Sequence, residues 1–155
     1  INGYALAGGW SIAQICDLRL AAEDAKLGIT ETRVGLLPPF ATILPRLIPM
    51  SSVLELVFTS DPISAQRGLE IGFINKVVPQ EQLMAEALTL AKRVLTNSPL
   101  ALKHFKELAY RSLDMNISTI NPLILETYDQ LLQSQDSKEG PLAFTEKRLP
   151  QWEGM

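Results

Sequence analysis

The sequence contains one cysteine and one histidine, and this shortage removes two classes of site. Cys16 has no second thiol with which to form an internal disulfide, which favours a reducing compartment such as the cytoplasm. In a eukaryotic cell the mitochondrial matrix or a peroxisome fits equally well. One cysteine and one histidine also provide no cluster of metal ligands at a useful spacing, so we expect no metal site.

Long blocks of like charge and long apolar runs are also missing. The 14 basic and 17 acidic residues are scattered along the chain, so we expect no nucleic-acid partner. Apolar runs are interrupted well before the roughly 20 residues that a membrane span needs, and we expect no membrane partner. A chain of 155 residues is long enough for one compact domain that needs no disulfides.

The first half of the sequence predicts a mixture of strands and short helices, whereas the second half predicts helices alone. Strands are expected over residues 4–6, 17–22, 25–30 and 73–78. Short helices are expected over 10–16 (buried), 41–48, 51–59 (capped by Ser51) and 65–72 (capped by Ser64), with irregular chain over 33–39. Amphipathic helices are expected over 81–97, from Ser98 onward, and over about 118–134 and 141–148.

This arrangement is that of an α/β protein with a core over residues 1–78 and a helical region of the same domain over 79–155. Amphipathic helices at the end of a small domain commonly pack on neighbouring subunits, so we expect a homo-oligomer. The chain opens on INGYALAGG, a strand-like run with no partner strand nearby in sequence. Because a lone strand leaves its backbone unpaired, we expect the chain to be the second part of a larger domain.

The stretch GWSIA is one residue short of the G-x-S-x-G pattern that surrounds the nucleophile of serine hydrolases. Residues 4–13 supply the strand, glycine turn and helix that such a site needs. A serine triad also needs a histidine, and His104 lies among charged residues of a predicted amphipathic helix. A hydrolase that uses Ser11 is therefore a minor hypothesis, which labelling by a fluorophosphonate probe would test.

Gly8 and Gly9 lie at the predicted strand-to-helix turn and have two possible uses. Backbone N–H groups at a helix start are unpaired, and the lack of side chains lets a carbonyl oxygen approach them, as in half of an oxyanion hole. The alternative is a turn that only packs. A phosphate-binding loop is excluded because the required lysine is missing.

Glu31 follows the apolar run LGIT and precedes the irregular RVGLLPP. A carboxylate at the end of a mostly buried strand is suited to proton transfer. The alternative is a surface glutamate paired with Arg33.

Five blocks in order, INGYALAGG, CDLRLAAEDAKLGITETRVGLLP, PRLIP, ISAQRGLEIGFINKVV and KEGPLAFTEKR, resemble the enoyl-CoA hydratase/isomerase (crotonase) superfamily over essentially all 155 residues. The resemblance implies a spiral of β-β-α units with a C-terminal helical region, assembled into trimers or hexamers. It also implies that the substrate is an acyl-CoA thioester and that no further cofactor is used.

The resemblance implies roles for particular residues. In the family two N–H groups hold the thioester oxygen as an enolate; Gly8 matches the second, and the first comes from a loop upstream of this chain. Hydratases place one glutamate at the position of Ser11 and another at the position of Glu31, so one carboxylate is missing here. The expected catalytic residues are Gly8 and Glu31, and the expected substrate-binding residues are Gly9, Ser11, Pro38, Phe144 and Lys147.

Two of these binding residues lie in the closing block. Phe144 and Lys147 match family positions that contact CoA, often across a subunit interface, although Lys147 is also simply a cation at a helix C-terminus. The loop after Pro38 borders the family's acyl pocket, and here it reads PFAT, shorter by two residues than the usual glycine-rich stretch and stiffened by Pro39.

The leading hypothesis is an enzyme that isomerises or hydrates an enoyl-CoA. One carboxylate is enough to move a proton between two carbons, whereas adding water is helped by two. Other chemistry of the superfamily, such as decarboxylation, dehydration or racemisation, stays open. A non-catalytic or incomplete member that retains only oligomerisation or binding is the main alternative.

Overall fold

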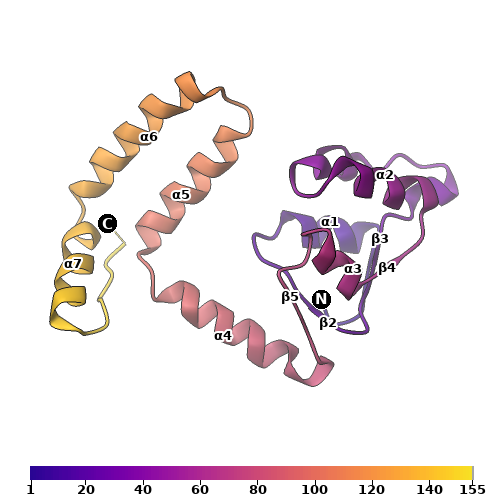
Figure 1. Cartoon of the computed structure of the whole chain (residues 1–155), viewed down its shortest axis with the longest axis horizontal. Coiled ribbons are helices and arrows are strands. Elements are labelled where there is room, and N and C mark those ends of the chain that lie inside the picture. Colours follow the sequence, from indigo (N-terminus) through magenta and orange to yellow (C-terminus); the bar gives the residue numbers. More distant parts are fainter. Residues whose placement is uncertain (155) are drawn as a thin grey trace. The chain divides into compact units, whose positions relative to one another are not determined.

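The structure, a computed structural model, describes residues 1–154. They form two compact units, Ile1–Leu88 and a second that begins at Thr89, and each is treated by itself (Figure 1). The sequence predicts a different boundary, after residue 78, between the core and the helical region of one domain, and that boundary stays a prediction.

The first unit contains two small sheets whose strands are interleaved along the chain. Strands β1 (Tyr4–Leu6) and β3 (Lys26–Gly28) are parallel, and β4 (Ile63–Ser64) lies antiparallel to β3, which gives the order β1-β3-β4. Strands β2 (Leu20–Ala22) and β5 (Lys76–Val78) form a parallel pair. The four predicted strands are therefore present, three of them shorter than expected, and β4 is an additional strand.

The shortening of β2 and β5 has a local cause in the residues that precede them. The Asn75 N–H donates to the Arg19 carbonyl oxygen at 2.8 Å, and the Arg19 N–H donates to Asn75 Oδ1 at 2.7 Å. A side chain thus takes the place of one backbone partner, and the regular ladder begins only at Leu20 and Lys76.

Short helices connect these strands. They are α1 (Gly8–Ile15), α2 (Met50–Thr59) and α3 (Ala65–Glu70), with 3₁₀ helices η1 (Glu31–Val34), η2 (Pro39–Arg46) and η3 (Gln80–Gln82). The irregular chain predicted over 33–39 is confined mainly to 35–38, because Pro39 starts η2 at a position where its missing N–H costs no hydrogen bond. Ser64 caps α3 as predicted, whereas α2 begins at Met50 after Pro49, so the cap predicted at Ser51 is wrong.

The core of the first unit centres on an aromatic stack. Trp10 and Phe73 are fully buried and stack with their ring centroids 4.2 Å apart. The Arg19 guanidinium lies 4.7 Å above the Phe73 ring and donates to the Phe73 carbonyl oxygen. These contacts cover one face of α1. Ile12 and Ile15 on its other side are 67% and 76% exposed, so the prediction of a buried helix is correct for the face of Trp10 and Ala13 and wrong for the opposite one.

The second unit is helical, as predicted. It contains most of α4 (Leu83–Leu95), and α5 (Pro99–Ser112), α6 (Ile117–Leu132) and α7 (Asp136–Glu146), with α5 and α6 packed side by side (Figure 1). Ser98 caps α5 through a bond from the Ala101 N–H, as predicted. Helix α7 begins at Asp136 and contains Pro141, so the start predicted at Pro141 is wrong.

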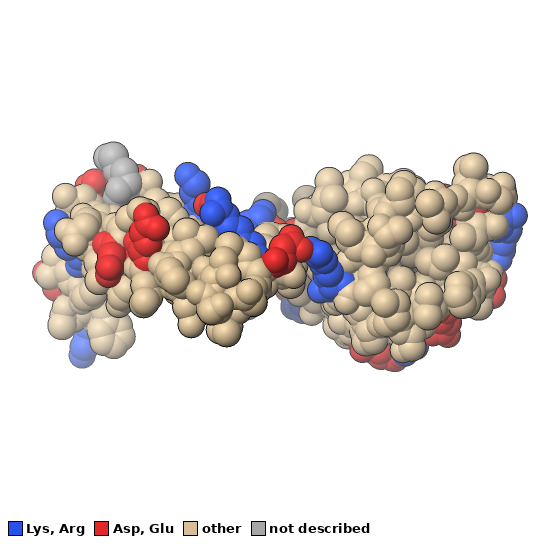
Figure 2. Space-filling view, turned by 90° about the horizontal axis from the view of Figure 1, so that it is seen from above, with Lys and Arg blue, Asp and Glu red and all other residues tan. Residues whose placement is uncertain are grey.

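The helices and the charged surface bear on membrane and nucleic-acid partners. No helix within residues 1–154 is long and apolar enough to cross a membrane. On the face shown in Figure 2, basic and acidic side chains lie interspersed among other residues and form no continuous patch of one sign.

Candidate active site

The carboxyl ends of β1 and β3 bring the two predicted catalytic residues to one sheet edge. The strands are parallel neighbours with Leu6 opposite Gly28, and the Ala7 N–H extends the ladder by donating to the Gly28 carbonyl oxygen at 3.0 Å. Gly8 follows β1 and Glu31 follows β3, each within a few residues of the strand end. Because parallel strands end at the same edge, this edge is the candidate site.

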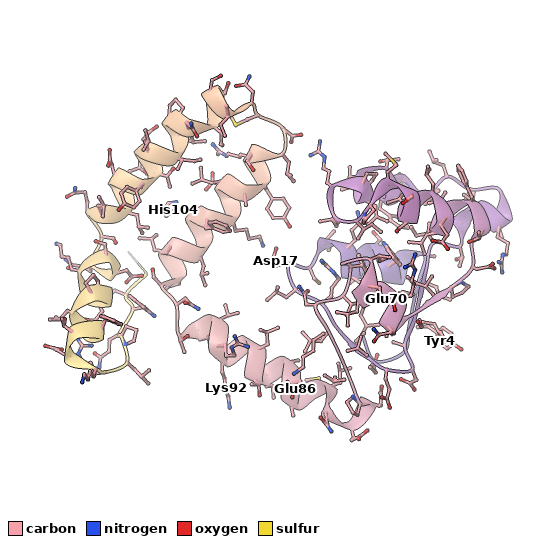
Figure 3. The ribbon with its side chains drawn as sticks, viewed as in Figure 1. Tyr4, Asp17, Glu70, Glu86, Lys92 and His104 are labelled. Atoms are coloured by element: carbon pink, nitrogen blue, oxygen red, sulfur yellow. The ribbon has the colours of Figure 1, made fainter. Side chains whose placement is uncertain are left out.

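The turn from β1 into α1 is strained at Ala7, whose φ of 50° lies in a region that disfavours residues with a Cβ. This strained position is where a hydrolase would place its nucleophile, and it holds an alanine. Ser11 lies one turn into the helix, where its N–H donates to the Ala7 carbonyl oxygen at 3.1 Å. His104 lies on α5 of the second unit (Figure 3). The position of Ser11 inside α1, and not at the strained turn, argues against Ser11 as a nucleophile.

Gly8 faces open space. A Cβ built on Gly8 would meet no atom within 4 Å, and its φ is outside the left-handed region. Neither packing nor backbone conformation thus requires glycine there. The first N–H groups of a helix have no intrahelical acceptor and carry partial positive charge. Gly8 therefore offers an accessible donor to a ligand oxygen. A Cβ built on Gly9 beside it would make only ordinary contacts with Tyr4 and Ala5.

The carboxylate of Glu31 is partly buried, and one of its oxygens is unsatisfied. Oε2 of Glu31 is buried and has no hydrogen-bond partner among the described residues. The pairing with Arg33 considered above is not its explanation, because Arg33 Nη2 pairs with Asp61 Oδ1 at 2.7 Å. Since buried polar atoms nearly always have partners, an unpaired carboxylate oxygen is a strong indication of a functional role.

Two contacts of the next residue hold Glu31 in place. Thr32 Oγ1 donates to the Val57 carbonyl oxygen at 2.6 Å and also bonds the buried hydroxyl of Ser60. After η1 the chain turns through Gly35, whose φ of 76° requires glycine, and the Leu36 N–H donates back to the Glu31 carbonyl oxygen at 3.0 Å. Glu31 is therefore carried on a turn that is tied to the end of α2.

Pro38 is fully buried and borders an apolar pocket of about 240 Å³ beside this turn. The pocket is lined by residues of η1, the loop after it, η2 and α2, namely Thr32, Leu37, Pro38, Ala41, Thr42, Pro45, Met50, Val53, Leu54 and Val57. The pocket is mostly aliphatic, which suits the hydrocarbon part of a ligand.

The other two predicted binding residues belong to the second unit. Phe144 on α7 is 87% exposed, and Lys147 ends this helix in a left-handed conformation with φ of 55°. An exposed aromatic ring and a cation at the end of a helix are both available for contact with a ligand.

Two residues important to this edge were not expected from the sequence. A Cβ on Gly28 would lie 3.2 Å from both the Leu6 side chain and the Pro62 backbone, so glycine lets the β1-β3-β4 edge close. A glycine at a strand end is a usable signal for such an approach. The strained turn at Ala7 has no signal, because alanine is not a residue that marks positive φ.

Comparison with known proteins assigns the chain to a family. A family model described as enoyl-CoA hydratase/isomerase matches residues 1–155. The chain belongs to the enoyl-CoA hydratase/isomerase family. Carnitinyl-CoA dehydratase from Salmonella typhi is 36% identical over 160 residues, an alignment that covers 99% of this chain and 61% of that protein.

Solved structures of the enoyl-CoA hydratase/isomerase family are also similar. The crystal structure of enoyl-CoA hydratase from Bacillus anthracis has a TM-score of 0.95 and 36% identity, and the match covers 100% of this chain and 61% of that one. For enoyl-CoA hydratase from Mycobacterium tuberculosis the values are 0.94 and 34%, with 99% and 62% covered. The chain thus spans less than two thirds of the length of these relatives.

These likenesses confirm the crotonase fold, with its C-terminal helical region, that the sequence motifs predicted. The roles of the individual site residues are not tested by them and stay predictions. Among residues 1–154, no group of three or more histidine, cysteine or acidic side chains is placed to hold a metal ion.

Proposed function

We propose that the chain carries the proton-transferring part of an active site for acyl-CoA thioesters. The observation that supports this most is the buried, unpaired Oε2 of Glu31 at the sheet edge where the open Gly8 N–H begins a helix. Two of the similar proteins are named as a carnitinyl-CoA dehydratase and an enoyl-CoA hydratase, and these names support a CoA ester as the substrate. The proposal includes no cofactor besides that ester.

The proposed reaction begins at the thioester carbonyl. The Gly8 N–H donates to this oxygen and stabilises the negative charge that develops when a proton leaves the adjacent carbon, C2. Glu31 takes the proton from C2 of a 3-enoyl ester, and the electrons delocalise into a dienolate. Glu31 then returns the proton at C4, which yields the conjugated 2-enoyl ester.

Ser11 decides between this isomerisation and hydration. It lies three residues after Gly8 in α1, and residues at this spacing share a helix face. A serine hydroxyl is not a general base at neutral pH, so Glu31 is the one carboxylate proposed to act. Hydration or dehydration is the second candidate, favoured by the names of the similar proteins.

Installing a carboxylate at this position tests the choice. In the full-length protein, Ser11→Glu is expected to raise the hydration rate of a 2-enoyl-CoA by about 100-fold, because a second carboxylate then helps to hold and split water. Ser11→Gln, of the same shape without charge, is expected to leave hydration near the wild-type rate. Both rates are measured from the absorbance of the conjugated ester.

A wild-type protein that hydrates this ester as fast as the Ser11→Glu variant would contradict the isomerase proposal and favour the second candidate.

Assembly into a homotrimer or hexamer is also part of the proposal, as is a cytoplasmic location, which the bacterial source of the relatives supports. Sedimentation of the full-length protein tests the assembly.

A further inference from the structure

The last described residues fold back onto the second unit. We name residues 148–154 the C-terminal strap. Trp152 Nε1 donates to the Thr96 carbonyl oxygen at 3.1 Å. Its ring lies against Gly140, where a Cβ would come within 3.3 Å of the indole, so glycine at this point of α7 makes room for the ring. The strap is therefore packed against α7 and not simply a loose end.

A buried carboxylate holds the end of the strap. Asp136, the first residue of α7, accepts the N–H groups of Glu153 and Gly154 at 2.9 and 3.2 Å, and the Ser98 hydroxyl at 2.6 Å. Burial raises the pKa of Asp136, but the hydroxyl and the two N–H groups together outweigh it and lower the pKa. Asp136 therefore stays ionised at neutral pH and holds the strap at the start of α7.

A second carboxylate holds the start of the strap. Both oxygens of Glu139 accept from the Arg148 guanidinium, at 2.5 and 2.9 Å, and Oε1 also accepts the Gln151 N–H at 2.7 Å. The Arg148 and Gln151 bonds lower the pKa of Glu139 to about 2. Paired bonds of this kind fix the orientation of both side chains.

Lys147 lies in sequence between the last residue of α7 and Arg148. Its left-handed backbone is closed by the Lys147 N–H, which donates to the Phe144 carbonyl oxygen at 3.3 Å. The Arg148 N–H donates to the Ala143 carbonyl oxygen at 3.0 Å. Lysine disfavours positive φ, so such a turn persists where neighbouring contacts hold it. Arg148, directly after this turn, bonds Glu139 through two nitrogen–oxygen contacts and Glu146 through one, and the bonds to Glu139 tie the turn back to the body of α7.

We propose that Glu139 and Arg148 are positioning residues that set the direction of Lys147 toward the phosphates of a CoA ester. This inference rests on the proposed function, which takes the substrate to be such an ester. A lysine ammonium is a point charge on a flexible stem, so its contribution to phosphate binding depends on where its backbone is held. We call the pair of Glu139 and Arg148 the clamp. It acts on the nucleotide end of the ester and leaves the reacting carbons unaffected.

Two esters separate a positioning role from a structural one. Calorimetry on the full-length protein measures binding of an acyl-CoA and of the matching acyl-pantetheine, which lacks the nucleotide phosphates. Glu139→Gln is expected to weaken acyl-CoA binding about 10-fold, the loss of one charge-assisted hydrogen bond, and to leave acyl-pantetheine binding unchanged. Glu107→Gln is the matched control, because Glu107 pairs with Arg111 on α5 at 2.6 Å and takes no part in the strap, and it is expected to leave binding of both esters unchanged.

Arg148→Lys provides a second variant, since it keeps the charge but loses the paired geometry, and the same selective loss is expected. Glu139→Gln and Arg148→Lys variants that keep the wild-type preference for acyl-CoA, or that weaken both esters equally, overturn the clamp. A wild-type protein that binds neither ester overturns the proposed function as well. If the wild type turns over the ester while both variants still prefer acyl-CoA to acyl-pantetheine, the clamp is overturned and the proposed function is not.

Discussion

Replacing Glu31 by glutamine is expected to reduce turnover of an acyl-CoA ester by roughly 100- to 10,000-fold, the range that a general acid–base residue contributes. Glutamine keeps the size of the side chain and its hydrogen-bonding oxygen but cannot take a proton. Binding of the ester is expected to stay within about twofold, because the substrate carbonyl is held by backbone N–H groups. Steady-state kinetics and calorimetry on the full-length protein measure the two quantities.

The matched control is Glu23→Gln, an identical change at an exposed glutamate between β2 and β3. It is expected to leave kcat unchanged. A Glu31→Gln variant that retains wild-type turnover, with its fold confirmed by circular dichroism, would show that Glu31 is not the base.

Removing the N–H of residue 8 is expected to reduce kcat by about 100- to 1000-fold, the usual cost of losing one oxyanion donor. Gly8→Pro achieves this, because Gly8 is the first residue of α1 and proline is well tolerated at that position of a helix. The change removes the donor without a loss of helical hydrogen bonds. Turnover is measured with the same ester as above, beside a thermal melt that confirms folding.

Gly8→Ala is the control, since it keeps the N–H and places its methyl group in open space. Its turnover is expected to fall much less than that of Gly8→Pro. Equal losses in the two variants would mean that the space in front of Gly8 matters and its N–H does not.

Local signals predicted many of the elements correctly. Ser64 and Ser98 accept the N–H bonds expected of helix caps, and the alternation of short strands predicted four of the five. The strand β4 escaped prediction because two residues carry no periodic pattern. The exposure of Ile12 and Ile15 also escaped it, since composition shows that a segment is apolar but not which of its faces is covered.

The candidate site was likewise predictable from the sequence only in part. An acid directly after an apolar strand is unusual and predicts a role for Glu31, and paired glycines mark a turn and predict one for Gly8; both roles stay predictions. Which residue occupies the strained turn is a tertiary property: the ladder between Ala7 and Gly28 places Ala7 there and moves Ser11 into the helix. The contact proposed to orient Lys147 joins Glu139 to Arg148, which lies nine positions later and beyond the end of α7, so the helical periodicity does not report it.

Exchange of substrate protons with heavy water tests the central claim most directly. Nuclear magnetic resonance of an acyl-CoA incubated in D₂O with the full-length protein is expected to show deuterium at C2, since Glu31 removes and returns that proton. In the Glu31→Gln variant the exchange is expected to be at least about 100-fold slower. Exchange at the same rate in both proteins, or none in the wild type, would contradict the account.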